Sequence, residues 1–228
     1  MQGLPMADFS AARRMMVDGQ VRTSDVTDLR IIDAFQSVVR ERFVAPSKTA
    51  LAYVDRDVPV ADGAGPASMR RMLKPMVLAK LIQAAQIEES DRVLIVGGTT
   101  GYSAAIVARL AGSVLALEED APLADRAANI LSALGCANVE AVYGPLTGGW
   151  AAGAPYDVIL IDGAVEVLPD PIRGQLRDGG RLVCVRGHKP PAKAFLYRSI
   201  EGELSGRPIF DATAPLLPGF AEKPAFVF

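Results

Sequence analysis

From Arg92 onward the sequence alternates short apolar runs with helix-like segments, and this alternation limits the chain to few folds. Between two of these runs lies DAPLADRAANILSALG, whose apolar residues share one helical face and whose Gly135 can end the helix. The pattern predicts an α/β fold with a doubly wound, mostly parallel sheet and helices on both faces. The five apolar runs, each bounded by turn residues as buried parallel strands should be, are RVLIV, SVLALE, NVEAV, DVILI and RLVCV.

The segments that flank the alternating region have different patterns. Residues 9–45 carry apolar side chains at helical spacing, and Asp28 stands where it would cap a helix. Glycine, proline and serine then mark an irregular loop in ADGAGPASMRR, and Pro75 begins an amphipathic helix. The C-terminal segment from Ala194 is typical of antiparallel strands around Gly and Pro turns.

We expect these segments to belong to one domain. In this interpretation residues 1–75 form an N-terminal helical layer and a loop, and residues 76–228 form the sheet core with a C-terminal hairpin extension. The 228 residues are enough to bury a substantial core, and half of them are hydrophobic, which argues against a disordered chain.

Charge and hydropathy exclude several classes of partner. The 24 basic and 26 acidic residues give a net charge of -2, so the chain has no general attraction to nucleic acid. The N-terminal residues lack the apolar segment of a secretory signal, and no run approaches the roughly 18 apolar residues of a membrane helix. We therefore expect a cytoplasmic protein that binds neither nucleic acid nor membranes.

Cysteine and histidine offer little material for metal or triad chemistry. Cys136 and Cys184 have no close ligand spacing, so we expect two reduced thiols, with Cys184 in the core. His188 is the only histidine, and it stands in a polar loop beside KPP. The sequence therefore predicts no metal site and no Ser-His-Asp triad.

A glycine-rich turn and an acidic residue point to a cofactor. Ligands of open parallel sheets bind beyond the carboxyl ends of the strands, and residues 97–101 follow the first strand at such a place. Glu118 follows the second strand about twenty residues later, where a carboxylate can accept both hydroxyls of a ribose. This spacing serves dinucleotides and S-adenosylmethionine alike. The residues that we expect at the cofactor are Gly97, Gly98, Thr99, Gly101, Tyr102 and Glu118.

The order of the segments resembles that of the protein-L-isoaspartate O-methyltransferases, class I S-adenosylmethionine enzymes that methylate isomerised aspartyl residues. The resemblance extends from about Arg13 to Val185. It implies a Rossmann-like class I methyltransferase fold, S-adenosylmethionine as cofactor and a role in protein repair on proteins or peptides with isoaspartyl residues. The segments that carry it are RRMMVDGQVRTSDVTDLRIIDAFQSVVRERFVAP, LAYVDRDVPV, VLIVGGTTGYSAA, LALEE, PYDVIL and LRDGGRLVCVRG.

Two departures from this family concern the side of the methyl acceptor. The family has an Ile-Ser-Gln-Pro segment, and the resemblance implies that its serine helps to position the substrate carboxylate. This chain has MLKP, so Leu73 occupies the serine position with a side chain that cannot form hydrogen bonds. The substrate-side loop before it is about six residues longer than a typical connection and contains Ser68, a weak candidate for a substitute. The catalytic residues thus stay unassigned.

Further departures concern the cofactor. Thr99 replaces a glycine of the turn, which strains the backbone if that residue needs a positive φ. The family has Gly-Asp-Gly after the third strand, where this chain has Pro145, which offers neither a side-chain acceptor nor a backbone N–H. Asp162 follows the fourth strand, where the family has uncharged residues. It would either contact the cofactor or cap the next helix.

Several functions remain open on this one fold. The first is a carboxyl O-methyltransferase that uses S-adenosylmethionine to methylate damaged aspartyl residues. The second is a catalytically impaired relative that acts as a binding or scaffold protein, and the third is a methyltransferase with a different acceptor. A dehydrogenase ranks last, because the dinucleotide fingerprint is incomplete. The sequence leaves the oligomeric state unassigned.

Overall fold

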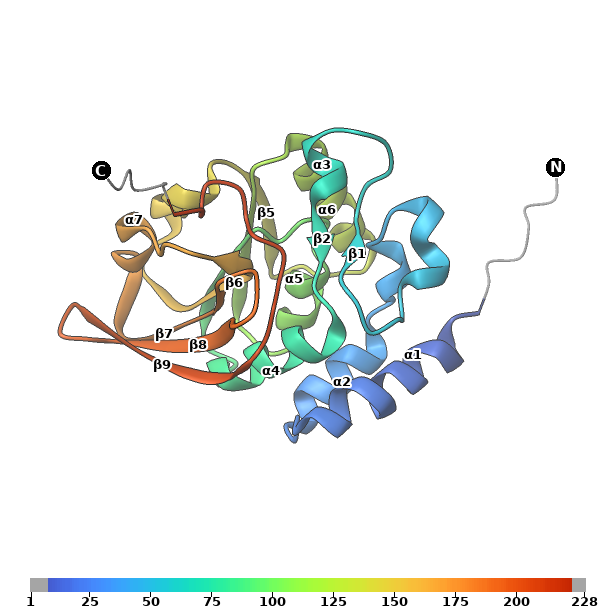
Figure 1. Ribbon diagram of the computed structural model, residues 1–228, viewed down its shortest axis with the longest axis horizontal. Helices are drawn as coiled ribbons and strands as arrows, with labels where there is room; N and C mark the ends of the chain where they lie inside the picture. Colours follow the sequence, from blue (N-terminus) through green and yellow to red (C-terminus); the bar gives the residue numbers. More distant parts are fainter. Residues whose placement is uncertain (1–7, 223–228) are drawn as a thin grey trace.

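The computed structural model describes residues 8–222 and has a seven-stranded sheet at its centre (Figure 1). The strands lie in the order β5-β4-β3-β6-β7-β8-β9, in parallel from β5 to β7 and antiparallel beyond. This confirms the predicted mostly parallel sheet with C-terminal antiparallel strands. Residues 223–228 of the predicted tail lie outside the described residues. The strands are β3 (Arg92–Val96), β4 (Ser113–Glu118), β5 (Val139–Tyr143), β6 (Tyr156–Val165), β7 (Leu176–Arg186), β8 (Lys193–Ile200) and β9 (Glu203–Asp211).

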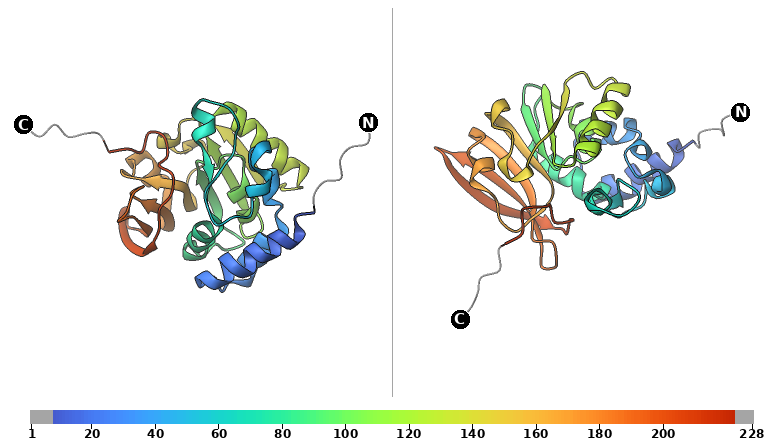
Figure 2. Two further views of the ribbon diagram at one scale, coloured as in Figure 1. Left: turned by 45° about the vertical axis from the view of Figure 1, so that its right-hand side comes forward. Right: turned by 90° about the horizontal axis from the view of Figure 1, so that it is seen from above.

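Helices α4, α5 and α6 cover one face of the sheet, and the N-terminal helices pack outside them (Figure 2). Within residues 8–222 no helix is long and apolar enough to cross a membrane. The helices on this side are α1 (Ser10–Met16), α2 (Leu29–Ser37), α4 (Pro75–Ala85), α5 (Tyr102–Val107) and α6 (Ala121–Ala133). They are joined by a π-helical turn (Val17–Val21) and by 3-10 turns (Arg22–Ser24, Arg40–Arg42 and Pro46–Leu51).

Local sequence signals set the ends of these helices. The Asp28 side chain accepts a hydrogen bond from the backbone N–H of Arg30 at 2.9 Å and so caps α2, as predicted. Gly135 follows α6 with a φ of +70°, a conformation that costs little only for glycine. The apolar faces that result form one core with the sheet, in which Phe35 from α2 packs edge-on against Tyr102 of α5.

The opposite face of the sheet is covered differently. Within residues 8–222 it carries one four-residue α-helix, α7 (Asp170–Arg173), with 3-10 turns at Leu146–Gly148 and Ala151–Gly153. The C-terminal segment completes this layer, with Leu217 and Phe220 buried against β3 and β6. The helical layer predicted for this face is therefore reduced, because β7 begins soon after β6 ends and leaves little chain for a longer helix.

The long substrate-side loop has more structure than its composition predicts. It contains the short helix α3 (Pro66–Met69), and strands β1 (Val58–Pro59) and β2 (Arg71–Met72) pair antiparallel at its base. This pairing turns the loop back across the carboxyl ends of β3 and β4 and brings Arg70 to the end of the sheet.

The two cysteines and the histidine stand as predicted. Cys136 and Cys184 are free thiols, and Cys184 is fully buried in the core. His188 lies beyond β7, where its Nδ1 atom is 3.0 Å from the carboxylate of Glu166. Within residues 8–222 no group of three or more His, Cys, Asp and Glu side chains is arranged to hold a metal ion.

Candidate cofactor site

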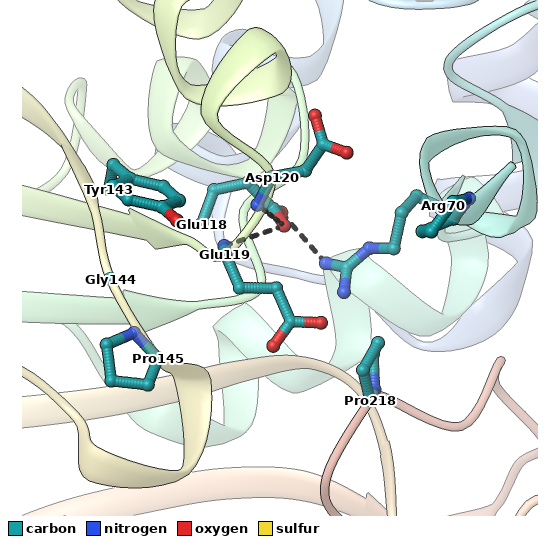
Figure 3. A pocket seen from close by; sticks show the side chains of 9 residues that line it. Arg70, Glu118, Glu119, Asp120, Tyr143, Gly144, Pro145 and Pro218 are labelled. Atoms are coloured by element: carbon teal, nitrogen blue, oxygen red, sulfur yellow. Dashed lines mark hydrogen bonds and ion pairs between the residues drawn. The ribbon is translucent and has the colours of Figure 1, made fainter.

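One pocket of the structure lies where a doubly wound fold binds ligands. The strand order reverses beside β3, since the chain continues to β4 on one side and later to β6 on the other. A pocket of about 370 Å³ opens at the carboxyl ends of the neighbouring strands β4 and β5 (Figure 3). Its size suits a small-molecule ligand. The lining residues are Pro66, Arg70, Glu118, Glu119, Asp120, Tyr143, Gly144, Pro145 and Pro218.

The glycine turn after β3 contacts the Arg70 side chain, but its residues are not among those that line the pocket. Gly97 and Gly101 have φ angles of +82° and +92°, and Gly101 directly precedes α5. A Cβ atom on Gly97 would lie 3.0 Å from the Leu217 side chain and 3.2 Å from the Arg70 guanidinium. Glycine is therefore required here by both conformation and space. Leu217 holds this place because the C-terminal segment runs along β6, with the Leu217 N–H donating to the carbonyl of Ala164.

Thr99 adopts the strained conformation that the sequence suggested. Its φ is +50°, a left-handed value that β-branched residues rarely adopt, and its side chain is buried. The backbone N–H of Thr99 donates to the Glu118 carboxylate at 2.8 Å. The charge-assisted hydrogen bond offsets part of the cost of the conformation.

We expect Thr99→Gly to raise the free energy of unfolding by up to about 1 kcal/mol. Removing the strain of a non-glycine residue in the left-handed conformation stabilises the folded state by roughly 1–2 kcal/mol. The greater conformational entropy of glycine in the unfolded chain offsets about half of this gain. The neighbouring Thr100→Gly is the matched control. It should cost about 1–3 kcal/mol, because the buried Thr100 hydroxyl donates to the Phe43 carbonyl. Urea unfolding measures the free energy of unfolding of both variants. A large decrease for Thr99→Gly would show that the Thr99 backbone is not strained.

Glu118 is buried at the end of β4 and accepts four hydrogen bonds. Its Oε1 atom accepts from the backbone N–H groups of Glu119 and Asp120, at 2.9 and 3.3 Å. Its Oε2 atom accepts from the Thr99 N–H and from the Nη2 atom of Arg70, each at 2.8 Å. Glu118 therefore stands beside the turn, as the spacing predicts, and is held there by the backbone of both strand ends.

Arg70 is a site residue that sequence reasoning missed. Its guanidinium points across the pocket at Glu118 (Figure 3). It also donates to the Gly97 carbonyl at 3.2 Å. Both partners of this ion pair are buried, with side-chain exposures of 6% and 2%. The one available signal was a pair of arginines in a lengthened loop, which by itself does not indicate a buried partner.

Asp162 lies next to the turn on the neighbouring strand. The parallel pairing of Val96 with Ile161 places Asp162 beside Gly97. The helix-cap interpretation of Asp162 is wrong, because β6 continues through Val165 and α7 begins only at Asp170. Burial raises the pKa of Asp162 to about 6, and the Ser103 hydroxyl, Arg70 and Arg40 offset part of this effect. Its Oδ1 atom has no hydrogen-bond partner among residues 8–222.

We expect Asp162→Asn to stabilise the protein at pH 8 and to change its stability little near pH 4. Above the folded-state pKa the wild-type carboxylate is charged at a cost, whereas below the ordinary value of 3.8 the group is protonated in both states. The gain therefore grows through this window and reaches about 3 kcal/mol. Urea unfolding at both pH values measures it, with the exposed Asp125→Asn as control. An equal effect at both values would contradict the raised pKa.

The two candidates on the acceptor side, Leu73 and Ser68, are not among the residues that line the pocket. Leu73 is fully buried in the core and is not a lining residue. Its backbone carbonyl accepts a hydrogen bond from Arg40 at 2.6 Å. Ser68 lies on α3, where its hydroxyl donates to the Gly65 carbonyl at 2.7 Å and so stabilises the loop locally. Leu73 thus offers no side-chain polar group, and the Ser68 hydroxyl is engaged by the Gly65 carbonyl.

Two other predicted residues, Pro145 and Tyr102, lie in different environments. Pro145 lines the pocket after β5 and is exposed, so it offers a flat apolar surface in place of an acidic one. Tyr102 begins α5 but is fully buried, with its ring 4.5 Å from the Arg40 guanidinium. Tyr102 thus supports the turn from behind, and Gly98 lies in the turn with a backbone N–H that donates to the Leu117 carbonyl.

Comparison with known sequences matches this chain to one family of methyltransferases. The family model described as Protein-L-isoaspartate(D-aspartate) O-methyltransferase matches residues 12–205. A protein-L-isoaspartate O-methyltransferase 1 of Rhodopseudomonas palustris is 38% identical over 188 residues, which cover 82% of this chain and 74% of that protein. A protein-L-isoaspartate O-methyltransferase of Koribacter versatilis is 33% identical over 221 residues, covering 96% of this chain and 97% of the relative.

Comparison with solved structures supports the same fold. A protein-L-isoaspartate O-methyltransferase superposes with a TM-score of 0.80 at 26% identity and covers 91% of this chain; the chain spans 66% of that structure. A Plasmodium falciparum structure, titled as a putative protein-L-isoaspartate O-methyltransferase in complex with S-adenosyl-L-homocysteine, has a TM-score of 0.71 at 14% identity. It covers 93% of this chain and 99% of its own, and it bears on the fold alone.

Proposed function

The chain belongs to the protein-L-isoaspartate O-methyltransferase family, and from this premise we propose that it methylates the carboxyl group of isoaspartyl residues in proteins or peptides with S-adenosylmethionine. The match over most of the chain carries the proposal. The predicted class I methyltransferase fold is confirmed, because β3 to β7, the glycine turn and the acidic strand end stand in the expected order.

The residues at the sheet ends fit a nucleoside-containing cofactor. In the proposal Glu118 accepts a ribose hydroxyl, and the turn at Gly97 and Gly101 lets the ligand approach the backbone. Tyr143 and Pro145 supply apolar walls for a base after β5. Asp162 adds a buried carboxylate with a free acceptor atom beside the turn, which suits the cationic amino-acid end of the cofactor.

The chemistry asks little acid-base work of the protein. When bound, S-adenosylmethionine supplies an electrophilic methyl group. The acceptor is an anionic carboxylate that needs no general base, so the protein contributes alignment and exclusion of water. The helical N-terminal layer and the loop that carries Arg70 and Leu73 are the elements that would cover the acceptor. The proposed reaction therefore does not require a general base among the residues of the pocket.

A binding protein without transfer activity is the second candidate function. Two observations favour it: Leu73 is buried where the family has its serine, and Glu118 is already paired with Arg70. A different acceptor on the same fold is an outcome of the same test. The cytoplasmic location and the lack of nucleic-acid partners remain proposals that rest on charge and hydropathy.

The test separates binding from transfer. The purified protein is incubated with radiolabelled S-adenosylmethionine and either an isoaspartyl peptide or its normal aspartyl counterpart. Base-labile methyl ester on the isoaspartyl peptide alone supports the proposed activity. Binding of S-adenosylhomocysteine by calorimetry without ester formation would support the binding protein, and ester on other carboxyl groups would support a different acceptor.

A further inference from the structure

The Arg70 guanidinium stands where Glu118 would receive a ribose, and we propose that Arg70 competes with the nucleoside of the cofactor for Glu118. The inference rests on the proposed function, because it takes Glu118 as the ribose acceptor. It makes Arg70 a residue that limits the affinity of the pocket for the nucleoside, because the ligand must displace the hydrogen bonds that the guanidinium donates to Glu118 and to the Gly97 carbonyl.

The acceptor capacity of Glu118 makes the two partners mutually exclusive. A carboxylate offers about four lone-pair sites, and all four are used in the structure. Three of the donors are backbone N–H groups of residues 99, 119 and 120, which are fixed by the turn and the strand end. Within residues 8–222, the guanidinium of Arg70 is the one side-chain donor to Glu118. A ribose hydroxyl can therefore donate a hydrogen bond to the Glu118 carboxylate only by displacing Arg70.

The position of the guanidinium supports the same conclusion. By contacting Glu118 and the Gly97 carbonyl, Arg70 bridges the carboxyl ends of β4 and β3. It lies close enough to Gly97 that a Cβ there would be 3.2 Å from its Nη2 atom. The close backbone approach that the glycine turn permits is thus used by Arg70 itself.

The arginine is incompletely satisfied in this place. Its Nη1 atom is buried and has no hydrogen-bond partner among residues 8–222. Burial without a partner is unfavourable for a charged donor, so Arg70 loses less on leaving than a fully bonded guanidinium would. The contact is therefore one that a ligand with two well-placed hydroxyls can replace.

The segment that carries Arg70 is suited to move. Helix α3 has four residues, β2 has two, and residues 62–66 are exposed. A region with few buried apolar contacts opens at lower free energy than the core. Glu119, which follows Glu118 in the sequence, also lines the pocket. Burial raises the pKa of Glu119 and the charge of Arg70 lowers it, so a displaced guanidinium keeps an acidic neighbour.

Calorimetry of the full chain with two ligands tests the competition. The ligands are S-adenosylhomocysteine and 5′-methylthioadenosine, which keeps the ribose and base but lacks the amino-acid end. For Arg70→Met we expect Kd for both ligands to fall by a similar factor of about 10 to 100, the equivalent of one charge-assisted hydrogen bond. Arg70→Lys keeps the positive charge but lacks the planar guanidinium, so its Kd values should lie between those of the wild type and Arg70→Met. The exposed neighbour Arg71→Met should leave both Kd values unchanged.

The outcomes separate this inference from the proposed function. Unchanged or weaker binding in Arg70→Met would overturn the competition, and weaker binding would instead make Arg70 a direct ligand contact. If Arg70→Met bound S-adenosylhomocysteine more tightly but not 5′-methylthioadenosine, Arg70 would compete with the amino-acid end of the ligand. That result would overturn the assignment of Glu118 to the ribose. If neither ligand binds the wild type or Arg70→Met, or if binding to Arg70→Met is indifferent to a further Glu118→Ala change, the assignment of the cofactor pocket itself fails.

Discussion

Replacing Glu118 with alanine is expected to lower the free energy of unfolding by about 3–5 kcal/mol, because it leaves Arg70 as an uncompensated buried charge. The same change also removes the acceptor of three backbone N–H groups at residues 99, 119 and 120. Urea unfolding at pH 7 measures the loss. If the free energy of unfolding fell by less than about 1 kcal/mol, water would be replacing the carboxylate as the partner of Arg70. That result would contradict an ion pair between Arg70 and Glu118 that is shielded from water.

The exposed pair of Lys193 and Asp211 is the matched control for this prediction. Its contact distance is 2.9 Å, close to the 2.8 Å of Arg70 and Glu118, but Asp211 is 84% exposed. Asp211→Ala should therefore cost no more than about 0.5 kcal/mol. Burial, not distance, decides the difference between the two pairs.

The effect of Glu118→Ala should depend on the residue at position 70. In an Arg70→Met background the stranded cation is absent, so we expect the cost to fall to about 1–3 kcal/mol, that of the unpaired N–H groups. Affinity for S-adenosylhomocysteine is best compared in the same background, where no guanidinium competes. There Glu118→Ala should weaken binding about tenfold to a hundredfold. Equal costs in both backgrounds would mean that the two side chains are not coupled.

The sequence predicted the parts of the molecule that depend on local pattern. Buried strands have continuous apolar runs, so β3 to β7 were found from hydropathy and turn residues alone. Glu118 was found because a strand end and a glycine turn fix its position relative to each other. The positive φ of Thr99 follows from the same turn geometry, whatever residue stands there.

The parts that the sequence did not reveal depend on contacts between distant segments. Arg70 meets Glu118 across 48 positions, through a loop with no periodicity to place it. Asp162 was weighed as a helix cap because local patterns do not show that β6 extends past it. Arg40 gave no sign of burial, since arginine is mostly exposed in proteins. Of these three buried charged residues, Arg70 lines the pocket.

Arg40 connects the N-terminal layer to the acceptor side through the backbone. Its guanidinium is fully buried and donates to the carbonyl groups of Ala52 and Leu73, at 2.7 and 2.6 Å. It also lies 4.5 Å from the ring centroid of Tyr102, a distance suited to a cation–π contact. Burial lowers the pKa of Arg40, and the electrostatic interaction with the Tyr102 side chain offsets part of this effect. The residue thus holds the 3-10 turn at 40–42, the chain at Ala52 and the strand end at Leu73 together.

We expect Arg40→Met to lower the free energy of unfolding by about 3–5 kcal/mol. Two hydrogen bonds from a charged donor are worth roughly 1.5–3 kcal/mol each, and their loss leaves two buried carbonyl groups unpaired. Release of a buried cation offsets only part of this cost. Arg42→Met, in the same turn but exposed, should change stability by less than about 0.5 kcal/mol. Because Arg40 fixes the Leu73 backbone, methyl transfer should fall with stability in Arg40→Met and stay normal in Arg42→Met; a stable Arg40→Met variant would show that the buried guanidinium costs as much as its contacts return.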